Sequence, residues 1–357
     1  MGFFSLTISI NANIQNEQRN KVMAIWLFVI AAMVFAMVVI GGLTRLTHSG
    51  LSMVDWRPFS GWLPPLDEST WQGLFEQYQK FPEFKKKNPD MQISGFKDIF
   101  WLEFIHRLWG RIIGLAFFLP FIIFAMRGWL SFSTFIRFAV IMMMGAGQGV
   151  LGWYMVKSGL IDRPDVSQYR LAAHLFLALL IYAYTIWVAL ALWHNTGFAI
   201  TWSVLSLLAV IFVLLVFATA FSGALVAGLD AGLTYNTFPL MDGDLIPDGI
   251  LNMQPVYINF FENIITVQFN HRCLAIITCT FAFVLWIYCC IKGVPKALTV
   301  AINYLLLIVI AQVTLGILTL LLVVPITLAV FHQATAVLVL GCAIWVLRLS
   351  IVKFSVT

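Results

Sequence analysis

Charged residues are scarce in this chain of 357 residues. Asp, Glu, Lys and Arg make up 10% of it and apolar residues 61%, and its mean hydropathy is +0.93. Because a soluble domain carries roughly 25% charged residues, this composition excludes a soluble protein and indicates a membrane protein. The formal net charge of +5 is small, and its placement indicates membrane orientation rather than binding to nucleic acid.

The sequence shows no cysteine outside the apolar runs, and we expect no cleavable leader. The five cysteines fall within or at the ends of two apolar runs: Cys273, Cys279, Cys289, Cys290 and Cys342. We therefore expect neither a disulfide nor a thiol relay outside the membrane. Residues 1–21 are mixed and polar with a single arginine, which fits neither a secretory signal nor a mitochondrial presequence. The expected location is a bacterial cytoplasmic membrane.

Apolar runs of about twenty residues recur along the chain. In lipid, a segment of this length satisfies its backbone hydrogen bonds only as a helix. The expected helices are 22–43, 101–126, 134–156, 168–192, 203–225, 264–290, 299–323 and 327–347. The sequence thus predicts an all-α integral membrane protein with eight transmembrane helices.

The basic residues between these helices favour one orientation. An even number of helices places both termini on one side of the membrane. That side carries Arg19, Lys21, Arg127, Arg137, Lys292, Lys296, Arg348 and Lys353. Apart from a long loop at 44–100, the opposite side carries only Lys157, Arg163 and Arg170. Since Lys and Arg accumulate in cytoplasmic loops, both termini are expected in the cytoplasm.

The two halves of the chain resemble each other. The recurring features are Phe104-Ile105-His106-Arg107 with Phe269-Asn270-His271-Arg272, Gln148–Gly152 with Gln312–Gly316, His174 with His332, and Gly41-Gly42 with Ser222-Gly223. Because four helices per half is an even number, both halves have the same orientation. This predicts a parallel repeat about a pseudo-two-fold axis along the membrane normal, built as two four-helix bundles.

The repeat also sets the expected domain boundaries. They are a cytoplasmic tail at 1–21, an N-terminal bundle at 22–195 with the long outer loop 44–100, a C-terminal bundle at 203–347 and a cytoplasmic tail at 348–357.

Four of the six histidines lie in the even-numbered helices: His106, His174, His271 and His332. Each follows its expected helix start by about seven residues, which places it roughly 10 Å below the outer surface at ~1.5 Å per residue. Ionisable residues in membrane helices are rare and mark functional sites, and paired imidazoles bind haem iron. A single buried histidine could instead bond a neighbouring helix, but the repeated pattern favours two haem sites.

The pairs are expected to be His106 with His174 and His271 with His332. Both pairs lie at one level in the outer half of the membrane. Electron transfer across a membrane requires haems near opposite faces, so this arrangement favours exchange between a cofactor and a substrate side by side. The other two histidines, His48 and His194, are interpreted as interfacial residues.

Glu103 distinguishes the first histidine pair. It precedes His106 by three positions, so both project from one helix face, whereas the matching position before His271 is Gln268. Since a carboxylate can orient a histidine or exchange a proton with a substrate, the N-terminal half is the candidate for chemistry. An interfacial carboxylate that reaches water or pairs with Arg107 is the equally open alternative.

Arg107 and Arg272 each follow a histidine directly. Guanidinium groups suit carboxylates such as haem propionates, so both are candidate cofactor-binding residues. Consecutive helical residues point ~100° apart, and the alternative is that these side chains extend to the interface. Gln148 and Gln312 are expected to join helices rather than to contact a ligand.

Further motifs resemble those of haem A synthases. They are Gly41-Gly42-Leu43-Thr44-Arg45-Leu46-Thr47, Gly50-Leu51-Ser52-Met53, Trp56, Pro58, Pro64-Pro65, Glu103-Phe104-Ile105-His106-Arg107, His174, Ala231-Gly232-Leu233, Tyr235-Asn236-Thr237-Phe238-Pro239-Leu240-Met241-Asp242-Gly243, His271-Arg272 and Phe331-His332-Gln333. The similarity spans roughly 22–347 in the expected order. The long first loop resembles that of the mitochondrial and α-proteobacterial type.

This resemblance implies an enzyme that oxidises the C8 methyl group of haem O to a formyl group through a hydroxymethyl intermediate, giving haem A for terminal oxidase assembly. It implies resident haem b in the C-terminal bundle, with His271 and His332 as axial iron ligands. It implies substrate haem O in the N-terminal bundle at His106 and His174, with Glu103 in the catalytic position. Some bacterial members carry cysteine pairs in outer loops, and this chain departs from them.

The resemblance also implies partners. Besides membrane lipid, these are haem O synthase and cytochrome oxidase subunit I or assembly factors, while homo-oligomerisation stays open and nucleic acid is not expected. Without the resemblance, the residues are also compatible with two other functions. One is a di-haem b-type cytochrome for electron transfer, and the other is a delivery protein for haem O or haem A. Both would leave the haem unmodified, whereas the synthase converts it.

Overall fold

The computed structural model describes residues 2–56, 60–160, 166–196 and 201–351. Pro58, Arg163 and Lys353, which entered the sequence argument, lie outside these ranges. Across the described ranges the chain is helical and forms no strand; one isolated bridge pairs Met241 with Asp244.

Eight of the helices are long and apolar enough to cross a membrane, which confirms the predicted all-α membrane fold. They are α1 (Gly2–Leu46), α4 (Ile93–Met126), α5 (Phe132–Gly159), α6 (Gln168–Trp193), α7 (Val204–Gly228), α9 (Ile264–Lys292), α10 (Lys296–Leu321) and α11 (Ile326–Ile351). Most boundaries agree with the expected ones within a few residues.

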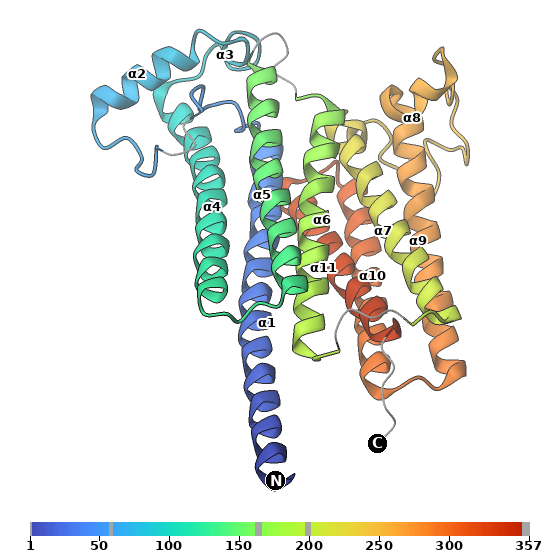
Figure 1. The fold of residues 1–357 in the computed structure, drawn as a ribbon. Coiled ribbons are helices and arrows are strands. Elements are labelled where there is room, and N and C mark those ends of the chain that lie inside the picture. The colour runs from blue at the N-terminus through green and yellow to red at the C-terminus, as the bar shows by residue number, and fades with distance from the viewer. Residues whose placement is uncertain (1, 57–59, 161–165, 197–200, 352–357) are drawn as a thin grey trace.

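Two helices begin earlier than the apolar runs indicated. The apolar span of α1 starts at Ile14, but no proline or glycine interrupts residues 3–21, so the helix continues through the segment expected to be a tail. Helix α4 starts at Ile93 rather than at 101, shortly after Pro89, and its first turns rise beside the short helices of loop 44–100 (Figure 1).

The eight helices contact one another in two rings. Helices α1, α4, α5 and α6 form one ring, and α7, α9, α10 and α11 form the other. Contacts of α6 with α7 and α11, and of α1 with α11, join the rings. These contacts favour the predicted division into two four-helix bundles, with α1, α6, α7 and α11 at the centre and more buried than the other four helices.

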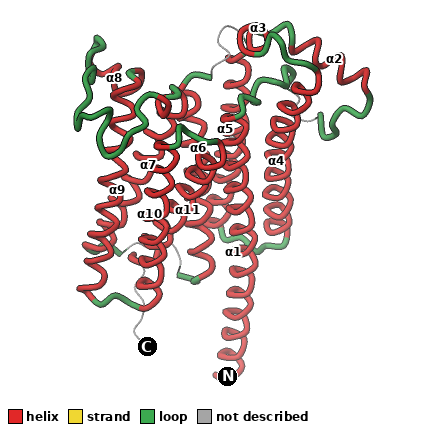
Figure 2. Tube along the Cα trace, turned by 180° about the vertical axis from the view of Figure 1, so that it is seen from behind, coloured by secondary structure: helices red, strands yellow, loops and turns green. Residues whose placement is uncertain are grey.

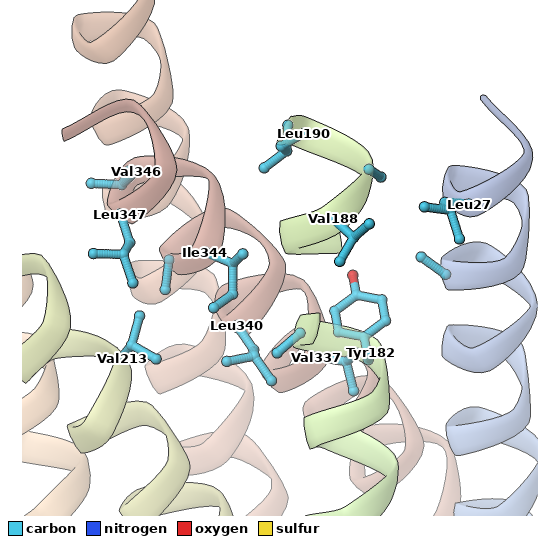
Figure 3. Packing of buried hydrophobic residues seen from close by; sticks show 14 of the residues in the cluster. Leu27, Tyr182, Val188, Leu190, Val213, Val337, Leu340, Ile344, Val346 and Leu347 are labelled. Atoms are coloured by element: carbon cyan, nitrogen blue, oxygen red, sulfur yellow. The ribbon is translucent and has the colours of Figure 1, made fainter. Parts of the chain in front are cut away.

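The apolar core fills the half of the central seam nearer to the termini. Figure 3 shows Leu27, Val188, Leu340 and Ile344 from three of the central helices meeting there around Tyr182. The four helical histidines lie in the opposite half of their helices. The apolar packing therefore holds the bundles together at one end and leaves the histidines together near the other.

The loops at the histidine end contain short helices. Helices α2 (Glu68–Tyr78) and α3 (Pro82–Lys87) lie between α1 and α4, and α8 (Asn259–Glu262) with two 3-10 turns, η1 (Ala231–Leu233) and η2 (Val256–Ile258), lies between α7 and α9. The start of α1 and the end of α11 lie at the other end of the molecule (Figures 1 and 2). Aromatic side chains fix α2 to the top of α4: Trp71, Phe75, Tyr78, Phe96, Phe100 and Phe104.

Candidate functional site

Each of the four helical histidines packs against a glycine of a neighbouring helix. In the N-terminal half, a methyl group added at Gly41 on α1 would lie 3.2 Å from Nε2 of His106. A methyl group added at Gly152 on α5 would lie 3.3 Å from Cε1 of His174. Larger residues at these positions would displace the rings, so glycine is what admits the imidazoles.

The C-terminal half repeats this arrangement. A methyl group at Gly223 on α7 would lie 3.0 Å from Cε1 of His271, and one at Gly316 on α10 would lie 2.7 Å from Cε1 of His332. The four rings are all half-buried, as expected for groups that line an internal space rather than a packed core.

The contacting glycines also fix the depth of the rings. Gly41, Gly223 and Gly316 each lie five residues before the end of their helix, and Gly152 lies seven before. Because α4 starts at Ile93, His106 lies thirteen residues into its helix, not about seven. The extra turns extend α4 outward, and the contact with Gly41 keeps His106 close to the level of the other rings.

The rings come together in the expected pairs. His106 and His174 are close enough to interact electrostatically, and so are His271 and His332. Within the described ranges, no group of three or more His, Cys, Asp or Glu side chains is placed to hold a metal ion. The arrangement therefore offers two imidazoles per site, which suits the two axial positions of haem iron.

Both rings of the C-terminal pair are held through Nδ1. The hydroxyl of Ser222 donates its single hydrogen to the backbone oxygen of Thr219 at 2.8 Å. It must therefore accept from Nδ1 of His271, which lies 2.9 Å away. Nδ1 of His332 likewise lies 3.2 Å from the backbone oxygen of Gln312, which can only accept. We assign the Nδ1–H tautomer to both rings, so each Nε2 has a lone pair for a metal.

The N-terminal pair lacks these bonds. Nδ1 of His174 is buried without a partner, and within the described part of the chain neither imidazole of this pair forms a hydrogen bond. Since Gly41 and Gly223 make the matching contacts, the position that matches Ser222 is Ile40, which has no hydroxyl to offer. The amide of Gln148 donates to the backbone oxygen of His174 at 3.0 Å and so joins α5 to α6, as predicted.

Glu103 is buried and fully engaged by the protein. Its Oε2 accepts hydrogen bonds from the hydroxyl of Ser52 and the backbone N–H of Met53, each at 2.7 Å. Its Oε1 lies 2.5 Å from Nη2 of Arg107. The carboxylate therefore holds loop 44–100 and the arginine one helical turn from His106. The pairing with Arg107 that the sequence left open is present.

Arg107 also donates hydrogen bonds to the same loop. It donates to the backbone oxygen atoms of Met53 at 2.7 Å and Asp55 at 2.8 Å, and its guanidinium lies 4.9 Å from the centre of the Trp56 ring. The loop that follows α1 is thus fastened over the N-terminal histidine pair.

Gln268 and Arg272 form the matching arrangement in the C-terminal half. The amide of Gln268 donates to the backbone oxygen atoms of Ala231 and Tyr235 and accepts from Arg272 at 3.3 Å. Arg272 also donates to the backbone oxygen atoms of Tyr235 and Thr237. A neutral amide thus takes the place of Glu103, and Nε of Arg272 is buried without a partner.

Sequence reasoning missed the two side chains that separate the halves most clearly, Ser222 and Ser52. Ser222 precedes Gly223, the counterpart of Gly41, and so stands where the other half has Ile40, while Ser52 is matched by Thr234. A comparison of the repeats position by position, rather than of their shared residues alone, carries that signal.

Fold and site together define a multi-pass membrane protein with two pairs of imidazoles side by side, a class suited to binding haem. The chain belongs to the COX15-CtaA family, described as "Cytochrome oxidase assembly protein", whose model matches residues 24–344. This confirms the family predicted from the sequence motifs.

Curated relatives match almost the whole chain. A protein of Nitrosospira multiformis named heme A synthase is 49% identical, over 91% of this chain and 92% of its own length. One of Parvibaculum lavamentivorans with the same name is 45% identical, over 94% and 96%. Heme A synthase COX15 of Bos taurus is 42% identical, over 94% and 84%. The similarity thus includes bacterial and mitochondrial members.

Proposed function

We propose that this protein is a haem A synthase, a membrane oxidoreductase that converts the C8 methyl group of haem O to a formyl group through a hydroxymethyl intermediate. The observation that carries the proposal is near-full-length similarity, up to 49% identity, to proteins named heme A synthase. The two imidazole pairs supply sites for a substrate haem and a cofactor haem.

The C-terminal pair is our candidate for the resident cofactor, haem b. Ser222 and the backbone oxygen of Gln312 fix the Nδ1–H tautomers of His271 and His332. Bonds of this kind orient a ligand ring and raise its basicity. Such rings are ready to hold iron permanently, and bound haem b would supply one-electron redox chemistry.

Arg272 is our candidate partner for a haem b propionate. Its Nε is a buried donor without a partner, and a buried unsatisfied donor costs about 1–3 kcal/mol. Its neighbour on the helix face is the neutral Gln268, so its charge is not balanced there. A carboxylate would satisfy both the donor and the charge. For Arg107, whose charge Glu103 already balances, contact with a propionate stays a prediction.

The N-terminal pair is our candidate for substrate haem O. Its rings have no hydrogen bonds that fix their orientation, which suits a group that must enter and leave. His106 and His174 position the substrate iron, and Glu103, one turn from His106, accepts a proton released during oxidation of the methyl group. Arg107 and Ser52 hold the carboxylate in place for this role.

We further propose a bacterial cytoplasmic membrane with both termini in the cytoplasm. The start of α1 and the end of α11 lie at one end of the molecule (Figure 1), and Arg127, Arg137, Lys292 and Lys296 lie near helix ends on that side. This distribution follows the positive-inside rule. The haem sites then face the outer side. Haem O synthase and subunit I of the oxidase are the proposed partners, as donor of the substrate and acceptor of the product.

The test is expression in a host that makes haem O but not haem A, followed by chromatography and mass spectrometry of the extracted haems. Appearance of haem A or its hydroxymethyl intermediate, absent with the vector alone, is the expected result. Unmodified haem O and haem b from folded protein with an intact b-type spectrum would instead favour an electron carrier or a haem delivery protein.

A further inference from the structure

Gln333 forms a hydrogen bond between the two halves of the molecule. It follows His332 on α11, and its Nε2 donates to the backbone oxygen of Val38 on α1 at 3.0 Å. Its Oε1 occupies the space beside Gly42, where an added methyl group would lie 2.1 Å from that atom. Glycine at position 42 therefore lets the amide reach the backbone of α1.

This contact lies at the level of the histidine pairs. Gly41, the neighbour of Gly42, is the residue against which His106 packs. On α11, Gln333 is the direct neighbour of His332. A short path of bonded and packed atoms thus joins a histidine of the N-terminal pair to one of the C-terminal pair.

Other polar contacts between the halves lie near one end or the other of the helices in the described part of the chain. Arg45 donates to the backbone oxygen of Ala227 and pairs with Asp230, and Tyr169 donates to Glu262. These contacts lie close to the outer ends of their helices. Near the opposite ends, the guanidinium of Arg348 on α11 lies 5.0 Å from the centre of the Trp187 ring on α6 and donates to the hydroxyl of Thr196. Gln333 is placed deeper, beside the rings.

The second seam between the halves is different. Leu175, which follows His174, matches Gln333 in the repeat. It packs against an apolar cluster that includes Ala224 and Leu225 of α7. The seam that joins His174 to the half containing His271 is therefore apolar at this position, and only the α1–α11 seam has an amide there.

We propose that Gln333 is a positioning residue that couples the two haem sites, so that occupancy of the N-terminal site changes the redox properties of haem b in the C-terminal site. This inference rests on the proposed function. Coupling between sites travels through packed and hydrogen-bonded contacts with a fixed geometry, and it acts in both directions. The contact of Gln333 with Val38 and Gly42 supplies such a link between His332 and His106.

The test uses full-length protein in detergent with its haem b bound. The probe for the N-terminal site is zinc protoporphyrin, because zinc accepts an imidazole but has no redox chemistry of its own. Fluorescence titration measures its binding, which His106→Ala should weaken. Spectroelectrochemistry then measures the midpoint potential of haem b with and without saturating probe, and we expect a shift in the wild-type protein.

Gln333→Met keeps the length of the side chain but removes the hydrogen bond, so the shift should be lost while haem b content stays unchanged. Gly42→Ala should have the same effect, because its methyl group displaces the amide from the α1 side and leaves α11 unaltered. Leu175→Met is the matched control on the other seam, and it should retain the full shift.

An equal shift in wild type, Gln333→Met and Gly42→Ala overturns the inference, and so does a wild type that fails to bind the probe or binds it without a shift. If Gln333→Met fails to retain haem b, the shift in the midpoint potential of Gly42→Ala decides whether the inference holds. Formation of haem A in the haem O host tests the proposed function separately. A wild type that forms haem A but shows no shift contradicts the coupling alone.

Discussion

Ser222 accepts a hydrogen bond from Nδ1 of His271 at 2.9 Å. In the other half, Gly41 packs against His106 as Gly223 packs against His271, and the residue before it is Ile40, which has no hydroxyl to bond the ring. The helices around these two rings correspond, so one hydroxyl separates a ring of fixed orientation from one that is held by packing alone. This difference is the physical basis for our proposal that one half holds a permanent cofactor and the other an exchangeable substrate.

Ser222→Ala should weaken the retention of haem b. Loss of a partner that orients a metal-binding histidine typically lowers affinity by about 10–100-fold. The rate of haem transfer to excess apomyoglobin measures this, and we expect it to increase. Ser222→Thr keeps the hydroxyl and should retain haem b nearly as well as the wild type. Equal rates for the alanine variant and the wild type would show that the hydrogen bond does not hold the cofactor.

Gly316→Ala should displace His332. The added methyl group would lie 2.7 Å from Cε1 of the ring, and overpacking of this kind costs about 1–3 kcal/mol. We expect a lower ratio of haem b to protein and a lower unfolding temperature. Gly149→Ala on α5 is the control, because an added methyl group meets nothing within 4 Å there. Alanine favours a helix by about 1 kcal/mol over glycine, so the control should be at least as stable as the wild type.

The transmembrane helices could be predicted from the sequence because apolar runs of sufficient length allow one conformation in lipid. The start of α4 at Ile93 could not, since a helix that rises beyond the membrane no longer follows the apolar pattern. The short helices of the outer loop were also missed. Helix α2 depends on a local cap, in which Asp67 accepts from the N–H of Thr70 at 2.8 Å, and on aromatic contacts with α4.

Those parts of the site that depend on residue types at matched positions of the two halves could be predicted from the sequence. The histidine pairs and the two readings of Glu103 followed from the repeat, and the pairing of Glu103 with Arg107 is a local contact on one helix. The contact of Gln333 with Val38 joins residues at opposite ends of the chain. No periodicity in the sequence encodes such a contact, because it depends on how the bundles pack.

His271→Ala should lower bound haem b more than His106→Ala. His271 belongs to the pair whose rings are fixed through Nδ1, whereas His106 belongs to the proposed substrate pair. The pyridine haemochrome content of each purified variant measures this directly. His194→Ala, at the end of α6 and outside both pairs, is a control that should keep the wild-type content. Equal losses in the two site variants would reverse or remove the assignment of the halves.

Glu103→Gln should retain haem b and lose formation of haem A. The C-terminal half already holds a glutamine next to an arginine at the matching positions, Gln268 and Arg272, so an amide is compatible with this geometry. It cannot take up a proton as a carboxylate does. Haem b is measured from the spectrum, and haem A by chromatography of haems extracted from the haem O host.

Glu103→Gln also removes the buried charge pair with Arg107. Because the arginine charge is then left uncompensated, the folded state typically loses about 3–5 kcal/mol of stability. Ser52→Ala separates this structural effect from the chemistry. It removes one hydrogen bond to Glu103 but keeps the carboxylate and its arginine, so we expect reduced stability with haem A still formed. Normal product yield from Glu103→Gln would remove this carboxylate from the reaction. Loss of product in both variants would instead assign Glu103 the role of holding the outer loop over the substrate.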